Sequence, residues 1–188
     1  MMQIMTDCSW LPEDEEQLNR QRRGWKNKKT GEAFEETIAH ACEQYKDKGI
    51  AEIEKTPEPI KQIGAKDRRG QFRACYQKKA QPDFKGTLRG GTSVVFEAKH
   101  TDGDRIAQSA VTEDQEKRLE RHWRLGAIAF VLVSLGQQDF YRVPWTTWRN
   151  MKTIYGHKHM KKEDLEQFRV AYKNGTLRFL EAPGDSES

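Results

Sequence analysis

Two carboxylates and one lysine have a spacing that could support catalysis. Two of these residues lie within a strongly apolar segment, and the third precedes it. Glu97 and Lys99 lie two residues apart in residues 92–99 (TSVVFEAK), which we predict to form a strand. Since side chains alternate along a strand, Glu97 and Lys99 share one face, about 7 Å apart. Thirteen residues separate Asp83 from Glu97, a length that allows a hairpin to bring the two carboxylates together. We therefore expect the three groups to converge on one face of a sheet.

These groups suit the binding of a hard divalent cation. Magnesium prefers oxygen ligands and is usually held by one or two carboxylates, with waters and substrate phosphates completing its shell. A lysine beside the metal can orient a water molecule, help it to lose a proton or stabilise charge on a phosphate. The sequence therefore predicts a Mg2+ site at Asp83 and Glu97 with Lys99 beside it, where Mn2+ can substitute. The alternative is a ladder of surface ion pairs along a strand.

A third carboxylate, Glu35, lies in a segment with helical periodicity. Glu35, Ile38 and Cys42 follow one another at positions i, i+3 and i+7, and Gly49 follows as a stop, so we predict a helix over residues 32–48. Glu35 borders the apolar stripe and should point partly inward, where a carboxylate without a partner is costly. A metal ion would satisfy it, which makes Glu35 a further candidate ligand.

The remaining pattern predicts one α/β domain with a mixed sheet flanked by helices. Thr112 and Gln115 form a capping box that opens a helix ending near residue 125. Further helices are expected from residue 144 and over residues 162–172. Strands are expected over residues 50–55, 80–86, 92–99, 127–134, 139–143 and 176–180, with a loop over 103–109. At 188 residues the chain is expected to hold one domain over residues 30–182, after an irregular or partly ordered N-terminal arm over 1–29 and before a tail over 183–188.

Positive charge is concentrated in two segments, although the net charge is only +4. Residues 20–29 hold six bases and no acid, and residues 61–79 hold seven bases against Asp67 alone. This density predicts a polyanionic partner, the alternative being ordinary solvated faces or a flexible arm. The second segment has few apolar residues and is expected to protrude as a hairpin or loop. Its bases are Lys61, Lys66, Arg68, Arg69, Arg73, Lys78 and Lys79.

Composition argues against several classes of protein. The mean hydropathy is −0.97, and the longest apolar run, residues 126–133, is far shorter than the roughly 20 residues that a bilayer requires. We therefore expect a cytoplasmic protein without a membrane partner. Cys8, Cys42 and Cys75 show no CxxC spacing, which predicts reduced thiols rather than disulfides or a zinc site.

Several segments resemble a known family. Pro82-Asp83 followed by Glu97-Ala98-Lys99 is the pattern of the PD-(D/E)xK nuclease superfamily. The strings GEAFEETIAHACEQY, AEIEKTPEPI, PDFKG, FEAKHT and GAIAFVLVS, with Asp114-Gln115 among them, are similar to the RecU family of Holliday junction resolvases over residues 31–143. This resemblance implies a restriction-endonuclease-like core with a basic stalk at residues 61–79.

The resemblance also implies roles for individual residues. Glu35, Asp83 and Glu97 would bind the metal together with the carbonyl oxygen of Ala98, and Lys99 would act on the attacking water. The residues expected to contact DNA are Lys55, Thr101, Gln115 and the seven bases of the stalk. The implied activity is metal-dependent resolution of four-way DNA junctions by paired symmetric nicks in recombination and repair. Because such a junction has near-twofold symmetry, we expect a homodimer.

The sequence departs from the family pattern in places. Pro82-Asp83-Phe84 stands where Thr-Asp-Tyr is common, His100 replaces a glutamate, and the stalk is a few residues short. We expect His100 to point away from Lys99, and His157 and His159 to lie in a solvated loop. Two alternatives stay open: a restriction-like or repair endonuclease acting on duplex DNA, and a non-catalytic DNA-binding accessory protein.

Overall fold

The computed structural model describes the backbone of residues 11–57, 60–76, 81–136 and 138–181, and the side chains from residue 29 onward except at positions 60, 74 and 76. Lys78, Lys79 and the predicted tail over residues 183–188 lie outside the described residues. None of the described helices is long and apolar enough to cross a bilayer.

The centre of the molecule is a mixed sheet with the strand order β1–β4–β5–β7–β8. Neighbouring strands are antiparallel except β5 and β7, which run parallel. A parallel step requires a crossover, which helix α2 (Glu113–Arg124) supplies. The predicted α/β architecture with a mixed sheet is confirmed. The strands are β1 (Ala51–Lys55), β4 (Phe84–Leu88), β5 (Ser93–Thr101), β7 (Ile128–Leu135) and β8 (Asp139–Pro144).

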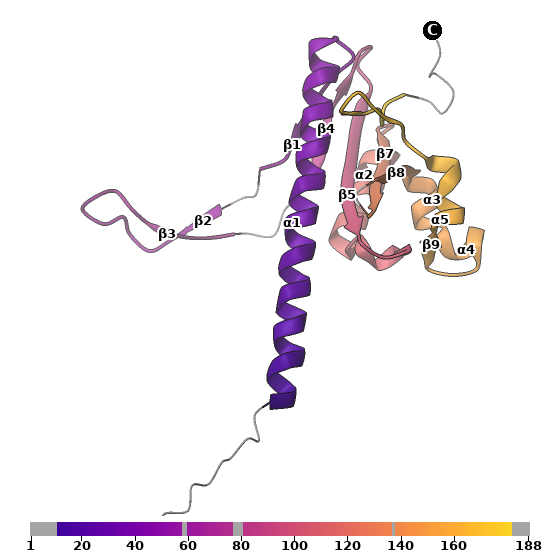
Figure 1. Cartoon of the computed structure of the whole chain (residues 1–188). Coiled ribbons are helices and arrows are strands. Elements are labelled where there is room, and N and C mark those ends of the chain that lie inside the picture. The colour runs from indigo at the N-terminus through magenta and orange to yellow at the C-terminus, as the bar shows by residue number, and fades with distance from the viewer. Residues whose placement is uncertain (1–10, 58–59, 77–80, 137, 182–188) are drawn as a thin grey trace, which may run out of the picture.

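Helices cover both faces of the sheet (Figure 1). Helix α1 (Leu11–Asp47) packs on one face, where Ile38 and Phe96 share a buried cluster. Helix α2 packs on the other face, where Leu119 and Val95 share a second cluster. Since consecutive residues of β5 belong to opposite clusters, the predicted alternation along this strand is confirmed. The odd-numbered residues of β5 therefore lie on the α2 face.

Two packing features hold β1 and β4 against β5. The rings of Phe84, Phe96 and Phe130 stack across three strands, with centroids 4.9 and 4.6 Å apart. Gly86 lets β1 approach closely, because a Cβ atom at this position would lie 2.0 Å from the carbonyl oxygen of Glu52. The ends of β1 and β4 nearest the candidate site are thus fixed by the core.

Helix α1 is longer than the predicted helix over residues 32–48. It begins at Leu11, so the prediction of an irregular arm is wrong for residues 11–29. These residues carry too few apolar side chains to show a buried stripe. A helix that continues from a packed segment needs no new nucleus, however, and gains one hydrogen bond per residue added. Figure 1 shows α1 running along the sheet and continuing well beyond it.

The described part of the predicted stalk over residues 61–79 is a protruding hairpin of residues 60–76. Strand β2 (Ile60–Ile63) pairs antiparallel with β3 (Arg73–Tyr76), and Figure 1 shows the hairpin reaching away from the sheet. At its tip, the Asp67 carboxylate accepts hydrogen bonds from the N–H groups of Arg69 and Gln71, at 2.8 and 2.9 Å. The tip is therefore a defined turn.

The region after β8 consists of short elements, several of which differ from the prediction. The helix expected from residue 144 is split in two, and the helix expected over 162–172 ends early and leads into a strand. The last strand covers two residues rather than five, and part of the expected loop over 103–109 is strand β6, paired with β9. Segments this short carry no measurable periodicity. The elements are β6 (Arg105–Ala107), η1 (Gln108–Ala110), α3 (Trp145–Arg149), α4 (Met151–Tyr155), β9 (His159–Lys161), α5 (Lys162–Leu165), η2 (Glu166–Phe168), β10 (Tyr172–Lys173) and β11 (Thr176–Leu177).

Candidate active site

The candidate site begins where the pairing between β4 and β5 stops. Phe84 lies opposite Phe96, so the same register places Pro82 opposite Ala98. Proline has no N–H and cannot continue the ladder, and β4 accordingly begins at Phe84, later than predicted. The Ala98 N–H donates instead to Asp83 Oδ2 at 3.3 Å. Because a strand residue presents its N–H and C=O at the same edge, the Ala98 carbonyl also faces this gap.

Asp83 is held from both sides. Its carbonyl oxygen accepts a hydrogen bond from the Thr56 N–H at 2.8 Å, and its carboxylate accepts the Ala98 N–H. Only 6% of the Asp83 side chain is exposed. The backbone of three segments therefore determines where this carboxylate points, which is the rigidity that a binding or catalytic group requires.

Lys99 lies between the two carboxylates. Its Nζ atom is 4.0 Å from Asp83 Oδ2 and 3.7 Å from Glu97 Oε2. Glu97 is fully buried and Lys99 is 19% exposed, so both lie on the inner side of the site. The structure thus brings together the three side chains that the strand pattern predicted to converge. Burying such charges is costly unless they are paired, and Lys99 is shared between Asp83 and Glu97.

Gln115 is oriented toward Glu97 by the start of α2. The Thr112 hydroxyl accepts from the Gln115 N–H at 3.4 Å, and Gln115 Oε1 accepts from the Thr112 N–H at 3.0 Å. With its oxygen used in this capping box, the amide donates through Nε2 to Glu97 Oε2 at 2.5 Å. The sequence revealed the capping box as a helix start. It did not reveal that the same box aims the amide at a carboxylate of the site.

Glu35 is placed differently from the other candidate ligands. Its Oε2 atom lies 2.6 Å from Nζ of Lys55, at the end of β1. Within the part of the chain that the structure describes, no three Asp, Glu, His or Cys side chains gather closely enough to hold a metal ion. Helix α1 covers the face of β5 that carries Phe96, whereas Glu97 and Lys99 lie on the opposite face. The helical period identified the inward side of α1 but could not identify the face of the sheet that it covers.

Apart from Lys55, the described residues that were predicted to contact DNA fall into two groups. Thr101 and Gln115 lie beside the carboxylate cluster, where the Thr101 hydroxyl accepts the Gly103 N–H at 3.1 Å. The described stalk bases are all exposed: Lys61, Lys66, Arg68, Arg69 and Arg73. The stalk also exposes two apolar side chains, Ile63 (52%) and Phe72 (43%), and Lys66 Nζ lies 5.8 Å from the Phe72 ring centroid.

The histidines stay outside the carboxylate cluster. His100 points away from Lys99, as predicted. Its ring nitrogens lie 3.2 Å from Ser134 Oγ and 3.1 Å from Asp102 Oδ1. His157 and His159 do not lie in a simple loop, because His159 begins β9 and the two rings stack with centroids 4.0 Å apart.

Comparison with known proteins assigns the chain to a family. The model of the family RecU, Recombination protein U, matches residues 29–182. A search of curated proteins found no match. Among solved structures, the chain is similar to Hjc, a Holliday junction resolvase from the archaeal hyperthermophile Archaeoglobus fulgidus. The TM-score is 0.40 and the identity 17%, over 61% of this chain and 77% of that one.

The family match spans α1 from residue 29 onward, the sheet, the stalk and the candidate site, and it extends beyond the segments in which the sequence resemblance was found. It confirms the resemblance on which the sequence-based interpretation relied. The chain therefore belongs to the RecU family, that of Recombination protein U, and is a Holliday junction resolvase.

Proposed function

We propose that this resolvase is a divalent-metal-dependent endonuclease that acts in the cytoplasm as a homodimer and cuts four-way DNA junctions by paired symmetric nicks. The observation that carries the proposal is the position of Lys99 between Asp83 and Glu97, at the point where Pro82 interrupts the ladder. The two carboxylates at this gap are buried, and Lys99 is the most exposed of the three side chains at 19%.

The donor set of the gap fits magnesium. Asp83 and Glu97 offer carboxylate oxygens, and Ala98 offers a carbonyl oxygen. Pro82, which lies opposite Ala98, has no N–H to donate to that carbonyl. Oxygen ligands of this kind are what Mg2+ prefers, and Mn2+ accepts the same set. When bound there, the metal would polarise the scissile phosphate and favour ionisation of the attacking water.

The residues around the gap have separate tasks. Lys99 carries three N–H donors and no acceptor, so it stabilises negative charge that develops on the phosphate and orients the water for in-line attack. Gln115 holds the Glu97 carboxylate in one orientation. Attack of the water oxygen on phosphorus forms one P–O bond and breaks the bond to the 3′ oxygen, which leaves a 5′-phosphate and a 3′-hydroxyl. These ends can be ligated.

Glu35 and Lys55 form a pair that binding of DNA would separate. In the structure the Glu35 carboxylate is satisfied by the Lys55 ammonium at 2.6 Å. If a DNA phosphate takes over Lys55, the Glu35 carboxylate becomes available as a further metal ligand. Both roles therefore depend on the substrate, and the role of Glu35 also requires its carboxylate to move toward the opposite face of the sheet, where Glu97 and Lys99 lie.

The stalk supplies contacts to the junction rather than chemistry. Its exposed bases suit phosphates, and a twofold homodimer would present two stalks and two active sites to a near-symmetric four-way junction. Arg68→Ala/Arg69→Ala should weaken junction binding and flatten its dependence on salt concentration. Unchanged affinity and salt dependence would remove the tip from the binding surface. A solution mass of 21.9 kDa by light scattering at assay concentration would contradict the dimer.

A cleavage assay with labelled DNA tests the proposal. Wild type, Asp83→Asn and the control Asp47→Asn, an exposed position at the end of α1, are given a four-way junction or a linear duplex of equal length with Mg2+. Wild type and the control should make paired nicks in the junction, and Asp83→Asn should be slower by about a thousandfold or more. Equal cutting of the duplex would indicate a general endonuclease. Junction binding without cutting by any of the three would indicate an accessory protein.

A further inference from the structure

A basic hollow lies beside the last residues of β5, and the proposed chemistry does not use it. Thr101 forms one wall, two residues after Lys99 and therefore on the same face of the strand. The opposite wall comes from β6 and from the segment that leads into β9. The polar lining residues are His100, Thr101, Arg105, Lys158 and His159. Through Thr101, the hollow adjoins the face that carries the candidate site.

The pairing of β6 with β9 creates this hollow from segments about 50 residues apart. Ile106 lies opposite Met160, and both side chains are buried in the cluster beneath α2. Because side chains alternate, Arg105 and His159 lie on the other face of this ribbon. The Gln108 side chain holds the ribbon to α3 by donating to the carbonyl oxygens of Trp148 and Arg149, at 2.9 and 3.1 Å.

Arg105 and Lys158 differ from His100, whose ring contacts the Asp102 carboxylate at 3.1 Å. In the part of the chain that the structure describes, no Asp or Glu oxygen lies within 4.0 Å of the charged atoms of Arg105 or Lys158. Burial raises the pKa of Glu116, and the positive charge of Lys158 opposes part of this rise. Burial, followed by the charges of His157, Arg105 and Lys161, lowers the pKa of His159. The hollow is therefore a region of positive potential.

We propose that this hollow binds a DNA backbone phosphate next to the scissile one, on the same strand, and that Arg105 and Lys158 position that strand in the active site. The inference rests on the proposed nuclease function. Two residues along β5 correspond to about 7 Å, which leaves room for a neighbouring phosphate of an extended strand. The Thr101 hydroxyl can donate to the same phosphate, because its oxygen already accepts from Gly103.

Charge variants with a matched control test the proposal. Arg105→Ala/Lys158→Ala removes both cations, whereas Arg105→Lys/Lys158→Arg keeps them. The control Lys48→Ala/Arg89→Ala removes two exposed charges at the other end of β5, where Arg89 N–H bonds to Ile50 and Leu88 N–H to Thr92. Junction binding is measured over a range of salt concentrations without divalent metal, so that no DNA is cut. All substituted positions are exposed, and circular dichroism verifies the fold of each variant.

We expect the double alanine variant to bind about tenfold more weakly. The slope of log affinity against log salt concentration should become less steep by about one, as for the loss of one phosphate contact. The charge-keeping variant should recover most of the affinity, and the control should match wild type. Equal loss in the control and the double alanine variant would overturn the proposal. If wild type binds no DNA, the proposed function fails and this inference fails with it.

Substitution of single phosphates by uncharged methylphosphonates then locates the contact. One position beside the cut should weaken wild type but leave the double alanine variant unaffected, because that variant has already lost the interaction. If every methylphosphonate weakens the two proteins equally while wild type still cuts junctions, the hollow does not hold the strand, although the nuclease assignment stands.

Discussion

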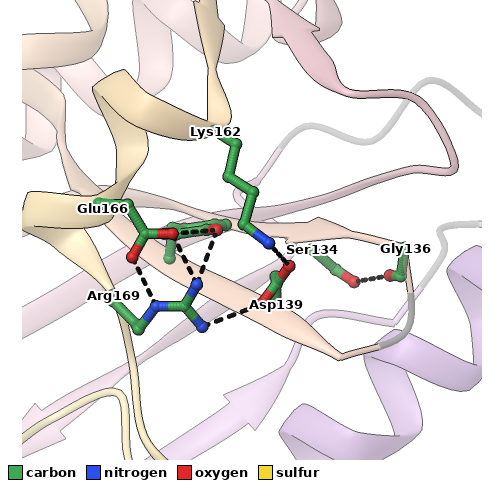
Figure 2. Close-up of polar contacts among 7 residues, drawn as sticks. Ser134, Gly136, Asp139, Lys162, Glu166 and Arg169 are labelled. Atoms are coloured by element: carbon green, nitrogen blue, oxygen red, sulfur yellow. Dashed lines mark hydrogen bonds and ion pairs between the residues drawn. The ribbon is translucent and has the colours of Figure 1, made fainter.

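Two clusters of acidic and basic side chains, one at the edge strand β8 and the other at the central strand β5, are built in opposite ways. In the first, which Figure 2 shows, Asp139 and Glu166 contact Lys162 and Arg169 directly, at 2.6 to 2.9 Å. Its two negative and two positive charges balance, and both basic side chains are nearly half exposed. It joins β8 to α5 and the turn after it, which is a structural task.

The second cluster is the candidate active site. Here two carboxylates share one ammonium at 3.7 and 4.0 Å, distances longer than those of a direct hydrogen bond, and all three side chains are largely buried. The comparison indicates that the first cluster is complete by itself, whereas the second is spaced to accept a further cation and a water molecule.

The two clusters should differ most in how the cleavage rate responds when the lysine of each is replaced by alanine. Lys99→Ala should slow junction cleavage by about a hundredfold to a thousandfold, as expected when a donor to developing charge is lost. Lys162→Ala should leave cleavage unchanged and lower the free energy of unfolding by less than about 1 kcal/mol, because its ion pair is exposed. Single-turnover cleavage and chemical denaturation measure the two effects. A large loss of activity in Lys162→Ala would contradict the purely structural role of the first cluster.

A smaller effect should follow from changing the amide that orients Glu97. Gln115→Glu keeps the capping box, since glutamate is a usual partner of threonine there, but removes the Nε2 donor and places a second negative charge near Glu97. Cleavage should fall about tenfold or more, whereas the unfolding free energy should change by no more than about 0.5 kcal/mol. Full activity in this variant would show that the contact of Gln115 with Glu97 is incidental.

The smallest effect concerns a third carboxylate with a purely structural role. Glu120 accepts hydrogen bonds from Trp145 Nε1 at 2.7 Å and from Arg149 at 2.8 Å. The bond from Trp145, followed by those from Arg149 and Arg124, lowers the pKa of Glu120 from 4.5 to about 2. The folded state thus favours the ionised form. The resulting stabilisation is present above about pH 4.5 and is lost as the pH falls toward 2.

Unfolding by urea at pH 5 and pH 3 measures this contribution. We expect wild type to lose on the order of 1 kcal/mol more than Glu120→Gln between these pH values, after allowance for solvent screening. Identical losses in the two proteins would mean that Glu120 is not held in its ionised form by α3.

The cluster of the candidate active site was accessible to sequence analysis because it depends on local rules. Alternation along β5 places Glu97 and Lys99 on one face, and a single hairpin brings Asp83 beside them. The capping box of Thr112 likewise follows from residues three apart. These features involve neighbouring segments whose geometry is set by the chain itself.

Other features depend on long-range packing and could not be predicted. The Glu35–Lys55 pair depends on the face of the sheet that α1 covers, which helical periodicity does not encode. The basic hollow depends on two three-residue strands, β6 and β9, that are too short to show a pattern. The N-terminal part of α1 lacks an apolar stripe, so its helical form follows only from continuity with the packed part of the same helix.

Binding of Mn2+ tests the central claim most directly, because it separates the two clusters without relying on activity. Mn2+ is titrated into wild type, Asp83→Asn and Asp139→Asn, and bound metal is measured by electron paramagnetic resonance. We expect wild type and Asp139→Asn to bind Mn2+ alike, whereas Asp83→Asn should lose that site. Equal binding by all three proteins, or loss of binding in Asp139→Asn alone, would contradict it.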